Sequence, residues 1–483
     1  IPPQITIITQ DFNPISLLKY FDKVYTKTSQ MGFEALMMGC ECVTYGMPFY
    51  AGWGLTIDKQ TCPRRTRKLS LEELFAGAYI LYCHYYNPIY QRKSDIFDTL
   101  KTIKKYSYQS SSKKAFMFGF SFWKHHFIFG YSQKKPNFIQ PFLQEFDPKN
   151  IIFIHPVFCD PLSLALKKGL NADCEIFIWG RKTFDSIESF AKANTIKLVR
   201  VEDGFIRSLS LGSDLTRPFS LVFDDMGIYF DPNTPSRLEN ILENTTFTAD
   251  LLEEASCLKK QILTSKISKY NIHKHATLNL PKDKTILLVI GQVEDDASIL
   301  FGARGRGNQS LLEQVRHENP KAYILYKPHP DVLSGNRLGH IKTQIALQYC
   351  DKIIENISLH SAIQASHEIH TLTSLSGLEA LMYGKKVVTY GMPFYAGWGL
   401  TIDKQTCPRR TRKLSLEELI AGVYLLYPRY IHPKTLQYCC AEVLIKCLQQ
   451  DQKKLHESIS ETFKNKIYTF FSRKIQKLFR KIL

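Results

Sequence analysis

The sequence lacks long apolar runs, and its cysteines form no recognisable metal or disulfide pattern. Apolar stretches such as Ile286–Ile290 are far shorter than the roughly 18 residues that a membrane-spanning helix needs. The twelve cysteines are scattered and include no CxxC pair, so we expect free thiols in a reducing cytosol and no zinc site. No signal peptide is recognisable, and because the chain begins at Ile1 rather than Met, we expect part of the natural N-terminus to be missing.

Common catalytic and nucleic-acid-binding motifs are also absent. There is no Walker A motif, no HExxH, no GxSxG, and no GxGxxG placed after a strand. Acidic residues are outnumbered: 63 Lys and Arg face 45 Asp and Glu, which gives a net charge of +18. This excess favours an anionic partner, but no RNP, zinc-finger or helix-turn-helix pattern accompanies it. We therefore expect no nucleic-acid partner.

One segment of the chain occurs twice without a change. Val43–Leu74 and Val388–Leu419 are identical over 32 residues, at an offset of 345 residues, and weaker similarity continues on both sides. This offset is far too long for a solenoid repeat. It indicates two whole modules, of which the first is present only in its final part.

After residue 114, short apolar runs alternate with helical patterns. The predicted strands are Ile151–Ile154, Glu175–Trp179, Lys197–Val201, Thr285–Ile290, Ala322–Tyr326 and Lys386–Tyr390. The predicted helices include Asp185–Ala193 and Leu311–Glu318. This alternation predicts an α/β fold with parallel sheets, whose ligands lie in a crevice at the carboxyl ends of the strands.

The expected organisation follows from the repeat and these patterns. Residues 1–90 are the remnant of a first module, and residues 91–114 are a linker that is basic and serine-rich in its second half. Residues 115–280 and 281–440 are two Rossmann-like domains of a complete second module, and 441–483 are a tail. Within that tail, Lys464–Leu483 has seven Lys or Arg, no acid, and apolar residues every three or four positions. This pattern predicts a basic amphipathic helix for an anionic membrane surface; a helix packed on its own domain is the alternative.

Acidic residues follow two of the predicted strands. Glu202 and Asp203 precede a glycine turn and Arg207, and either carboxylate can serve as a general acid or base; an ordinary acidic turn is the alternative. The three acids Glu294–Asp296 repel one another, so cations, hydrogen bonds or a raised pKa must offset that repulsion. They can hold a divalent metal, supply a nucleophile, or face water.

Two further segments are suited to an anion. Lys327-Pro-His329-Pro follows a strand, and its two prolines fix the backbone around the histidine. The hydroxyls of residues 373–376 and Gly377 precede a helical run, where free backbone N–H groups bind phosphate well. A kinked loop with a structural histidine and a plain helix cap are the alternatives.

Together these segments resemble one family closely. EDGFIRS (202–208), QVEDDAS (292–298), KPHP (327–330), SLSGLEAL (374–381) and YGMPFYAGWGLT (390–401), in this order and with a tandem module, are similar to the capsule polysaccharide KpsC/LipB-type proteins. These are dual-module retaining β-Kdo glycosyltransferases, Kdo being an acidic sugar. The resemblance implies a GT-B-like fold, with two Rossmann-type domains facing across a crevice.

The resemblance also implies a reaction and its partners. Family members transfer Kdo from CMP-β-Kdo to a (lyso)phosphatidylglycerol-linked acceptor, on the cytoplasmic face of the inner membrane, and so build the lipid linker for capsule export. We therefore expect CMP-Kdo, a phosphatidylglycerol-type lipid and capsule assembly and export proteins as partners. No cofactor is implied and no metal is required.

Roles for individual residues follow from the same resemblance. Asp296 would be the nucleophile, and Glu202 or Asp203 the general acid or base of a double displacement. The substrate-binding residues would be Gln292, Ser298, Arg207, Lys327, His329, Ser374, Ser376, Gly377 and Glu379.

The first module departs from the family pattern. It has no counterpart of the Glu-Asp-Gly, Gln-x-x-x-Asp-x-Ser or His-Pro segments, and Met31 stands where the second module has Ser376. This remnant cannot be a catalyst alone. Two other functions stay open: an inverting, sialyltransferase-like CMP-sugar transferase, which needs no nucleophile such as Asp296, and a non-catalytic scaffold for capsule assembly.

Overall fold

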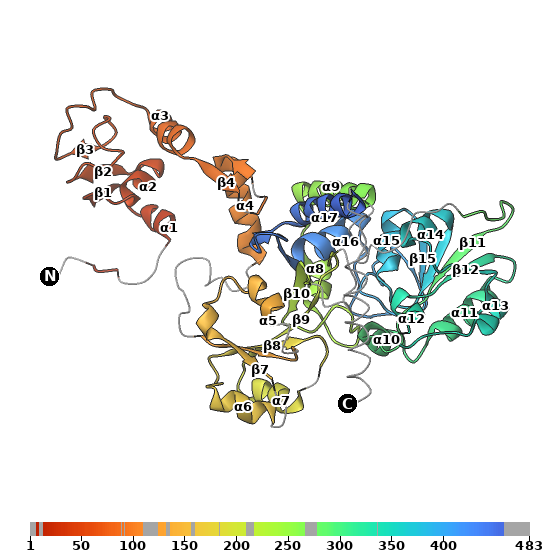
Figure 1. The fold of residues 1–483 in the computed structure, drawn as a ribbon. Helices are drawn as coiled ribbons and strands as arrows, with labels where there is room; N and C mark the ends of the chain where they lie inside the picture. Colours follow the sequence, from red (N-terminus) through yellow and green to blue (C-terminus); the bar gives the residue numbers. More distant parts are fainter. Residues whose placement is uncertain are drawn as a thin grey trace. The chain divides into compact units, whose positions relative to one another are not determined.

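The computed structural model describes residues 6–8, 13–87, 89–90, 92–109, 124–131, 136–155, 160–182, 184–208, 217–265, 278–335 and 337–457. These residues form two compact units. The first comprises residues 1–87 and 91–108, and the second comprises residues 88–90 and 109–483 (Figure 1). The predicted membrane-binding stretch Lys464–Leu483 lies outside the described residues. Among the described helices, none is long and apolar enough to cross a membrane.

The second unit contains a six-stranded sheet that is parallel throughout. Its order is β13-β12-β11-β14-β15-β16. The strands are β11 (Ile286–Ile290), β12 (Tyr323–Lys327), β13 (Lys352–Ile353), β14 (Glu368–Thr371), β15 (Lys386–Thr389) and β16 (Ile402–Asp403). In chain order this is 3-2-1-4-5-6, the order of a dinucleotide-binding sheet. The order reverses between β11 and β14, so a crevice is expected where these two strands end.

The second unit also contains a seven-stranded mixed sheet, in the order β18-β17-β10-β9-β8-β6-β7. Its strands are β6 (His126–Phe129), β7 (Ile151–Ile154), β8 (Glu175–Trp179), β9 (Lys197–Asp203), β10 (Ser220–Asp224), β17 (Pro428–Ile431) and β18 (Tyr438–Cys439). Strands β6 to β9 are parallel, and β10, β17 and β18 are antiparallel to their neighbours.

After the last strand of the six-stranded sheet, the chain returns to the seven-stranded sheet and adds two strands to it. Residues 428–440 were assigned from the sequence to the second domain, but β17 pairs with β10, and Tyr430 and Ile431 are buried beside it. Helix α17 (Ala441–Glu457), the start of the expected tail, packs against α9 (Ala249–Ser265), as Figure 1 shows. Its buried leucine and isoleucine side chains join those of α9 in one core, so residues 441–448 belong to the folded domain.

The first unit has the fold of the last half of the six-stranded sheet. Strands β1 (Lys23–Thr26), β2 (Glu41–Thr44) and β3 (Ile57–Asp58) are parallel and correspond, at the offset of 345, to β14, β15 and β16. Helices α2 (Met31–Met37) and α3 (Leu71–Phe75) correspond likewise to α15 (Ser376–Met382) and α16 (Leu416–Ile420). Strand β5 (Arg92–Ser94) and helix α4 (Ile96–Gln109) occupy most of the range expected to be a linker.

The predicted elements agree well with the structure. Strands β7 and β8 and helix α7 (Asp185–Ala193) have the predicted bounds, and strands β9, β11, β12 and β15 differ by one or two residues. Helix α11 (Asn308–Glu318) begins three residues earlier than predicted, because Gly307 rather than a later residue is its N-cap. The predicted α/β fold with parallel sheets is confirmed.

Candidate active site

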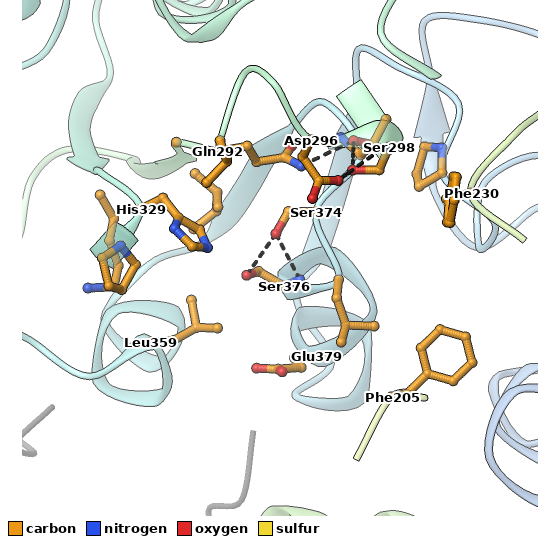
Figure 2. Close-up of a pocket in the computed structure, with 18 of the residues that line it drawn as sticks. Phe205, Phe230, Gln292, Asp296, Ser298, His329, Leu359, Ser374, Ser376 and Glu379 are labelled. Atoms are coloured by element: carbon orange, nitrogen blue, oxygen red, sulfur yellow. Dashed lines mark hydrogen bonds between the residues drawn. The ribbon is translucent and has the colours of Figure 1, made fainter. Parts of the chain in front are cut away.

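A cavity of about 340 Å³ lies at the carboxyl ends of β11, β12 and β14 and also reaches the end of β9. Nine of the twelve site residues predicted from the sequence line it: Glu202, Gln292, Asp296, Ser298, Lys327, His329, Ser374, Ser376 and Glu379. In Figure 2, Asp296 and Ser298 lie above Ser374 and Ser376, and Glu379 lies below these two serines. His329 lies on the opposite side of this view from Phe205 and Phe230.

Hydrogen bonds of Gln292 tie the end of β11 to the loop after β14. Its amide oxygen accepts from the backbone N–H of Thr373 at 2.9 Å, and its amide nitrogen donates to the Thr373 hydroxyl at 3.1 Å. Asn308 also binds the Gln292 backbone, accepting from its N–H at 2.8 Å and donating to its carbonyl at 2.7 Å. Gln292 is buried, and its hydrogen bonds join the loop after β11 to the loop after β14. These two loops flank the point where the strand order reverses.

The three consecutive acids have three different partners. Glu294 accepts from the backbone N–H of Asn308 at 2.7 Å, and Asp295 forms an ion pair with Arg337 at 3.0 Å. Asp296 is the N-cap of α10 (Ala297–Gly302), and its Oδ1 accepts from the N–H and the hydroxyl of Ser298 at 2.9 and 2.7 Å. Hydrogen bonds and one cation therefore offset the repulsion expected from the sequence. No three His, Cys, Asp or Glu side chains in the described part converge as a metal site would.

The Lys-Pro-His-Pro segment brings two nitrogen groups to the cavity. The ammonium of Lys327 donates to the carbonyl of Ile357 at 2.6 Å, and burial lowers the pKa of Lys327 to about 8. His329 is the N-cap of α12 (Pro330–Leu333), where its Nδ1 accepts from the N–H of Asp331 at 3.1 Å. A neutral His329 in this position carries its proton on Nε2.

The serine-rich loop folds back on itself before α15. Ser374 donates its hydroxyl proton to Ser376 Oγ at 3.0 Å, and the N–H of Ser376 donates to Ser374 Oγ at 3.2 Å. Gly377 does not line the cavity; a Cβ there would lie 2.1 Å from the hydroxyl of Tyr395. That hydroxyl donates to the backbone carbonyl of Ser374. Because Gly377 has no side chain, the Tyr395 ring can approach closely enough to make this hydrogen bond and so fix the loop.

The two neighbouring acids at the end of β9 have different surroundings. Glu202 lines the cavity, whereas Asp203 does not and accepts from the guanidinium of Arg207 at 2.7 Å. Arg207 is buried and lies away from the cavity, so it is a partner of Asp203. The structure therefore separates two carboxylates that the sequence left equivalent.

Other cavity residues were not predicted. Arg337 lies in the loop between α12 and α13 (Thr343–Tyr349), which has no motif, and His360 is the second residue of α14 (Leu359–Ala365). His360 Nδ1 is 2.6 Å from the hydroxyl of Tyr383, which also lines the cavity. Tyr229 and Phe394 stack edge to face across the cavity wall, with ring centroids 5.4 Å apart. Of these residues, Phe394 alone carried a signal, since it belongs to the repeated segment.

Comparison with known proteins agrees with this fold. The model of the family described as "Capsule polysaccharide biosynthesis protein" matches residues 3–86 and 175–430. The capsule polysaccharide modification protein LipA of Neisseria meningitidis serogroup B is 44% identical over 471 residues, which cover 94% of this chain and 64% of that protein. The lipopolysaccharide-processing protein LpsZ of Rhizobium meliloti is 43% identical over 257 residues, covering 52% of this chain and 58% of that protein. The chain thus spans less than two thirds of the length of these relatives.

Two solved structures of Thermosulfurimonas dismutans KpsC are also similar. The one titled β-Kdo 2,7 transferase has 35% identity and a TM-score of 0.55, and covers 68% of this chain and all of that chain. The one titled β-Kdo 2,4 transferase has 32% identity and a TM-score of 0.57, covering 67% of this chain and 98% of that chain. The GT-B-like fold expected from the motifs is therefore confirmed. The chain belongs to the capsule polysaccharide biosynthesis protein family, as a member of the KpsC/LipB type.

Proposed function

We propose that this protein is a glycosyltransferase that moves Kdo from CMP-β-Kdo to a lipid-linked acceptor with retention of configuration. One observation carries the proposal: Asp296, from the end of β11, and Glu202, from the end of β9, line the same cavity. Retention by double displacement needs one carboxylate as nucleophile and a second group that moves the proton. The two similar KpsC structures are of β-Kdo transferases, which supports the same reaction class.

In this proposal the donor lies along helix α15. Its phosphate takes hydrogen bonds from Ser374 and Ser376 at the start of the helix and from Nε2 of His329, and it is attracted by the charge of Lys327. Glu379 follows Ser376 by three residues, about 4.5 Å further along the helix axis, where it can accept from the sugar hydroxyls of the nucleotide.

The reaction then has two displacements. The Asp296 carboxylate attacks the anomeric carbon of Kdo, the bond from that carbon to the phosphate oxygen breaks, and CMP leaves with its charge stabilised by the groups around it. In the second step the acceptor hydroxyl attacks the same carbon from the other side, Glu202 takes its proton, and the bond to Asp296 breaks. Two inversions give net retention. Neither step uses a cofactor or a metal.

The acceptor in this proposal is a (lyso)phosphatidylglycerol carrying one or more Kdo residues, and the product is a linker for capsule polysaccharide. In this proposal the enzyme acts at the cytoplasmic face of the inner membrane, together with capsule assembly and export proteins. The basic, apolar pattern of residues 464–483 supports an anionic membrane partner. The LipA relatives, which are named capsule polysaccharide modification proteins, support the assignment to capsule synthesis.

The nucleophile is tested with Asp296→Asn and with Asp295→Asn as the matched control. We expect Asp296→Asn to abolish transfer from CMP-β-Kdo to a soluble Kdo-bearing acceptor, while Asp295→Asn retains it. Intact-protein mass spectrometry with CMP-β-Kdo and no acceptor should show one added Kdo on the unsubstituted chain. Turnover by Asp296→Asn, or transfer with inverted configuration, contradicts the retaining reaction. Absence of CMP release by the unsubstituted chain points to a scaffold.

A further inference from the structure

A chain of hydrogen bonds runs through Thr373 to the proposed nucleophile. The amide nitrogen of Gln292 donates to the Thr373 hydroxyl at 3.1 Å, and this hydroxyl donates to Ser298 Oγ at 3.3 Å. The Ser298 hydroxyl in turn donates to Oδ1 of Asp296 at 2.7 Å. Four side chains from the ends of β11 and β14 are thus joined in one line, and Figure 2 shows three of them, Gln292, Ser298 and Asp296, side by side.

The direction of this chain is determined at both ends. The backbone N–H of Thr373 can only donate, so the Gln292 oxygen must face it and the amide nitrogen must face the hydroxyl. At the other end, the ionised carboxylate of Asp296 can only accept. The two hydroxyls between these ends therefore have a single consistent orientation, in which every proton points toward Asp296.

Packing holds the Thr373 side chain in the rotamer that this chain needs. Its methyl group lies 2.8 Å from the position that a Cβ would take at Gly302, and 2.8 Å from the position of a Cβ at Gly391. The methyl group thus occupies a slot between two residues without side chains, and the side chain as a whole is buried. With the methyl group in this slot, the hydroxyl faces Gln292 and Ser298.

We propose that Thr373 is a positioning residue that, through Ser298, fixes Oδ1 of Asp296 and so presents Oδ2 to the anomeric carbon. Oδ1 accepts two hydrogen bonds from Ser298, and no bond to Oδ2 is found among the described residues. A carboxylate that can rotate divides its time between attacking and non-attacking orientations, and the hydrogen-bonded chain removes that freedom. The inference rests on the proposed function, because it takes Asp296 as the nucleophile.

Thr373→Val and Thr373→Ser separate the hydroxyl from the shape of the side chain. Valine keeps the branched shape and removes the hydroxyl, whereas serine keeps the hydroxyl. The assay uses the full chain with CMP-β-Kdo and a soluble Kdo-bearing acceptor. We expect Thr373→Val to lower kcat about tenfold, because a tenfold loss corresponds to the contribution of one hydrogen bond. The donor KM should stay within about twofold of its original value. Thr373→Ser should keep kcat within about threefold. An unchanged kcat in Thr373→Val, or equal losses in both variants, overturns the inference.

A double-substitution cycle tests whether Thr373 acts through Ser298. If it does, Ser298→Ala combined with Thr373→Val should be no slower than Ser298→Ala alone. Independent losses that multiply overturn the inference. The melting temperature of each variant is measured, and if Thr373→Val does not fold, Thr373→Ala replaces it in the same cycle. These results are distinct from failure of the proposed function, which would appear as turnover by Asp296→Asn or as no turnover in the unsubstituted chain.

Discussion

Arg409 and Arg64 occupy the same position in two identical segments, and among the residues that the structure describes only Arg409 has a carboxylate partner. Arg409 forms two hydrogen bonds with the buried Glu239 of α8 (Arg237–Asn244), at 2.6 and 3.3 Å, while Arg64 is exposed. The difference extends to aromatic residues: Tyr45 is 52% exposed, and its counterpart Tyr390 is fully buried. The same sequence is thus largely buried by neighbouring elements in the second unit and more exposed to solvent in the first unit.

This pair gives a matched test of stability. We expect Arg409→Ala to lower the free energy of unfolding by about 1–2 kcal/mol, because Glu239 stays buried with Arg410 as its remaining cationic partner. Arg64→Ala should change it by less than about 0.5 kcal/mol, as is usual for an exposed side chain. Urea unfolding followed by circular dichroism measures both. Equal effects at the two positions would show that the Glu239 contact contributes nothing.

The two acids at the end of β9 are expected to respond differently to loss of charge. Glu202→Gln should lower the rate of transfer by about 10²-fold or more, because it removes the group that takes the acceptor proton. Asp203→Asn should mainly lower the melting temperature, because Arg207 stays buried without its carboxylate. Steady-state rates and melting temperatures of both variants test this expectation. A large loss of rate in Asp203→Asn with a near-normal rate in Glu202→Gln would assign the proton transfer to Asp203.

His329 is expected to contribute directly to CMP binding. His329→Ala should weaken the affinity for CMP by roughly 1.5–3 kcal/mol, the contribution of a hydrogen bond to a charged group. His329→Asn retains a side chain that can cap α12 but lacks Nε2, so it should weaken binding to a similar extent. Calorimetry with CMP measures these affinities, with the exposed His317→Ala as control. Normal affinity in His329→Asn would mean that the histidine serves only as a cap.

The affinity for CMP should also depend on pH through Lys327. Burial lowers the pKa of this residue to about 8, so the ammonium is mostly charged at pH 7 and mostly neutral at pH 9. Because the charged form attracts the phosphate, the Kd for CMP should rise by up to about tenfold across this range. Lys327→Met should bind more weakly at pH 7 and show a flat profile. The same slope in both proteins would assign the titration to another group.

The basic stretch at the C-terminus is expected to bind anionic lipid. Each Lys or Arg near such a surface contributes about 1 kcal/mol, and residues 464–483 have seven of them. Deleting Lys464–Leu483 should release the protein from phosphatidylglycerol vesicles in co-sedimentation at low salt. Transfer to a lipid acceptor should slow, and transfer to a soluble acceptor should fall much less. Undiminished binding to the vesicles after the deletion would show that another surface holds the membrane.

The sequence alone determined the parallel α/β fold and nine of the residues that line the cavity. The reason is local: buried strands are short apolar runs, and the residues that follow them meet at one edge of a parallel sheet. The family motifs then pointed to the same strand ends. Arg337, in a loop, and His360, in the first turn of α14 (Leu359–Ala365), gave no signal, because neither directly follows a buried strand.

Only the tertiary structure separated residues that the sequence left equivalent. Glu202 and Asp203 are neighbours in one strand, so their side chains point to opposite sides of the sheet, and only the structure shows that Glu202 lines the cavity while Asp203 pairs with Arg207. The pairing of β17 with β10, and the hydrogen bonds that join Gln292, Thr373 and Ser298, link segments about 80 to 200 residues apart in the chain. Identical segments, finally, differ in burial because exposure depends on the neighbours that pack against a segment rather than on its own residues.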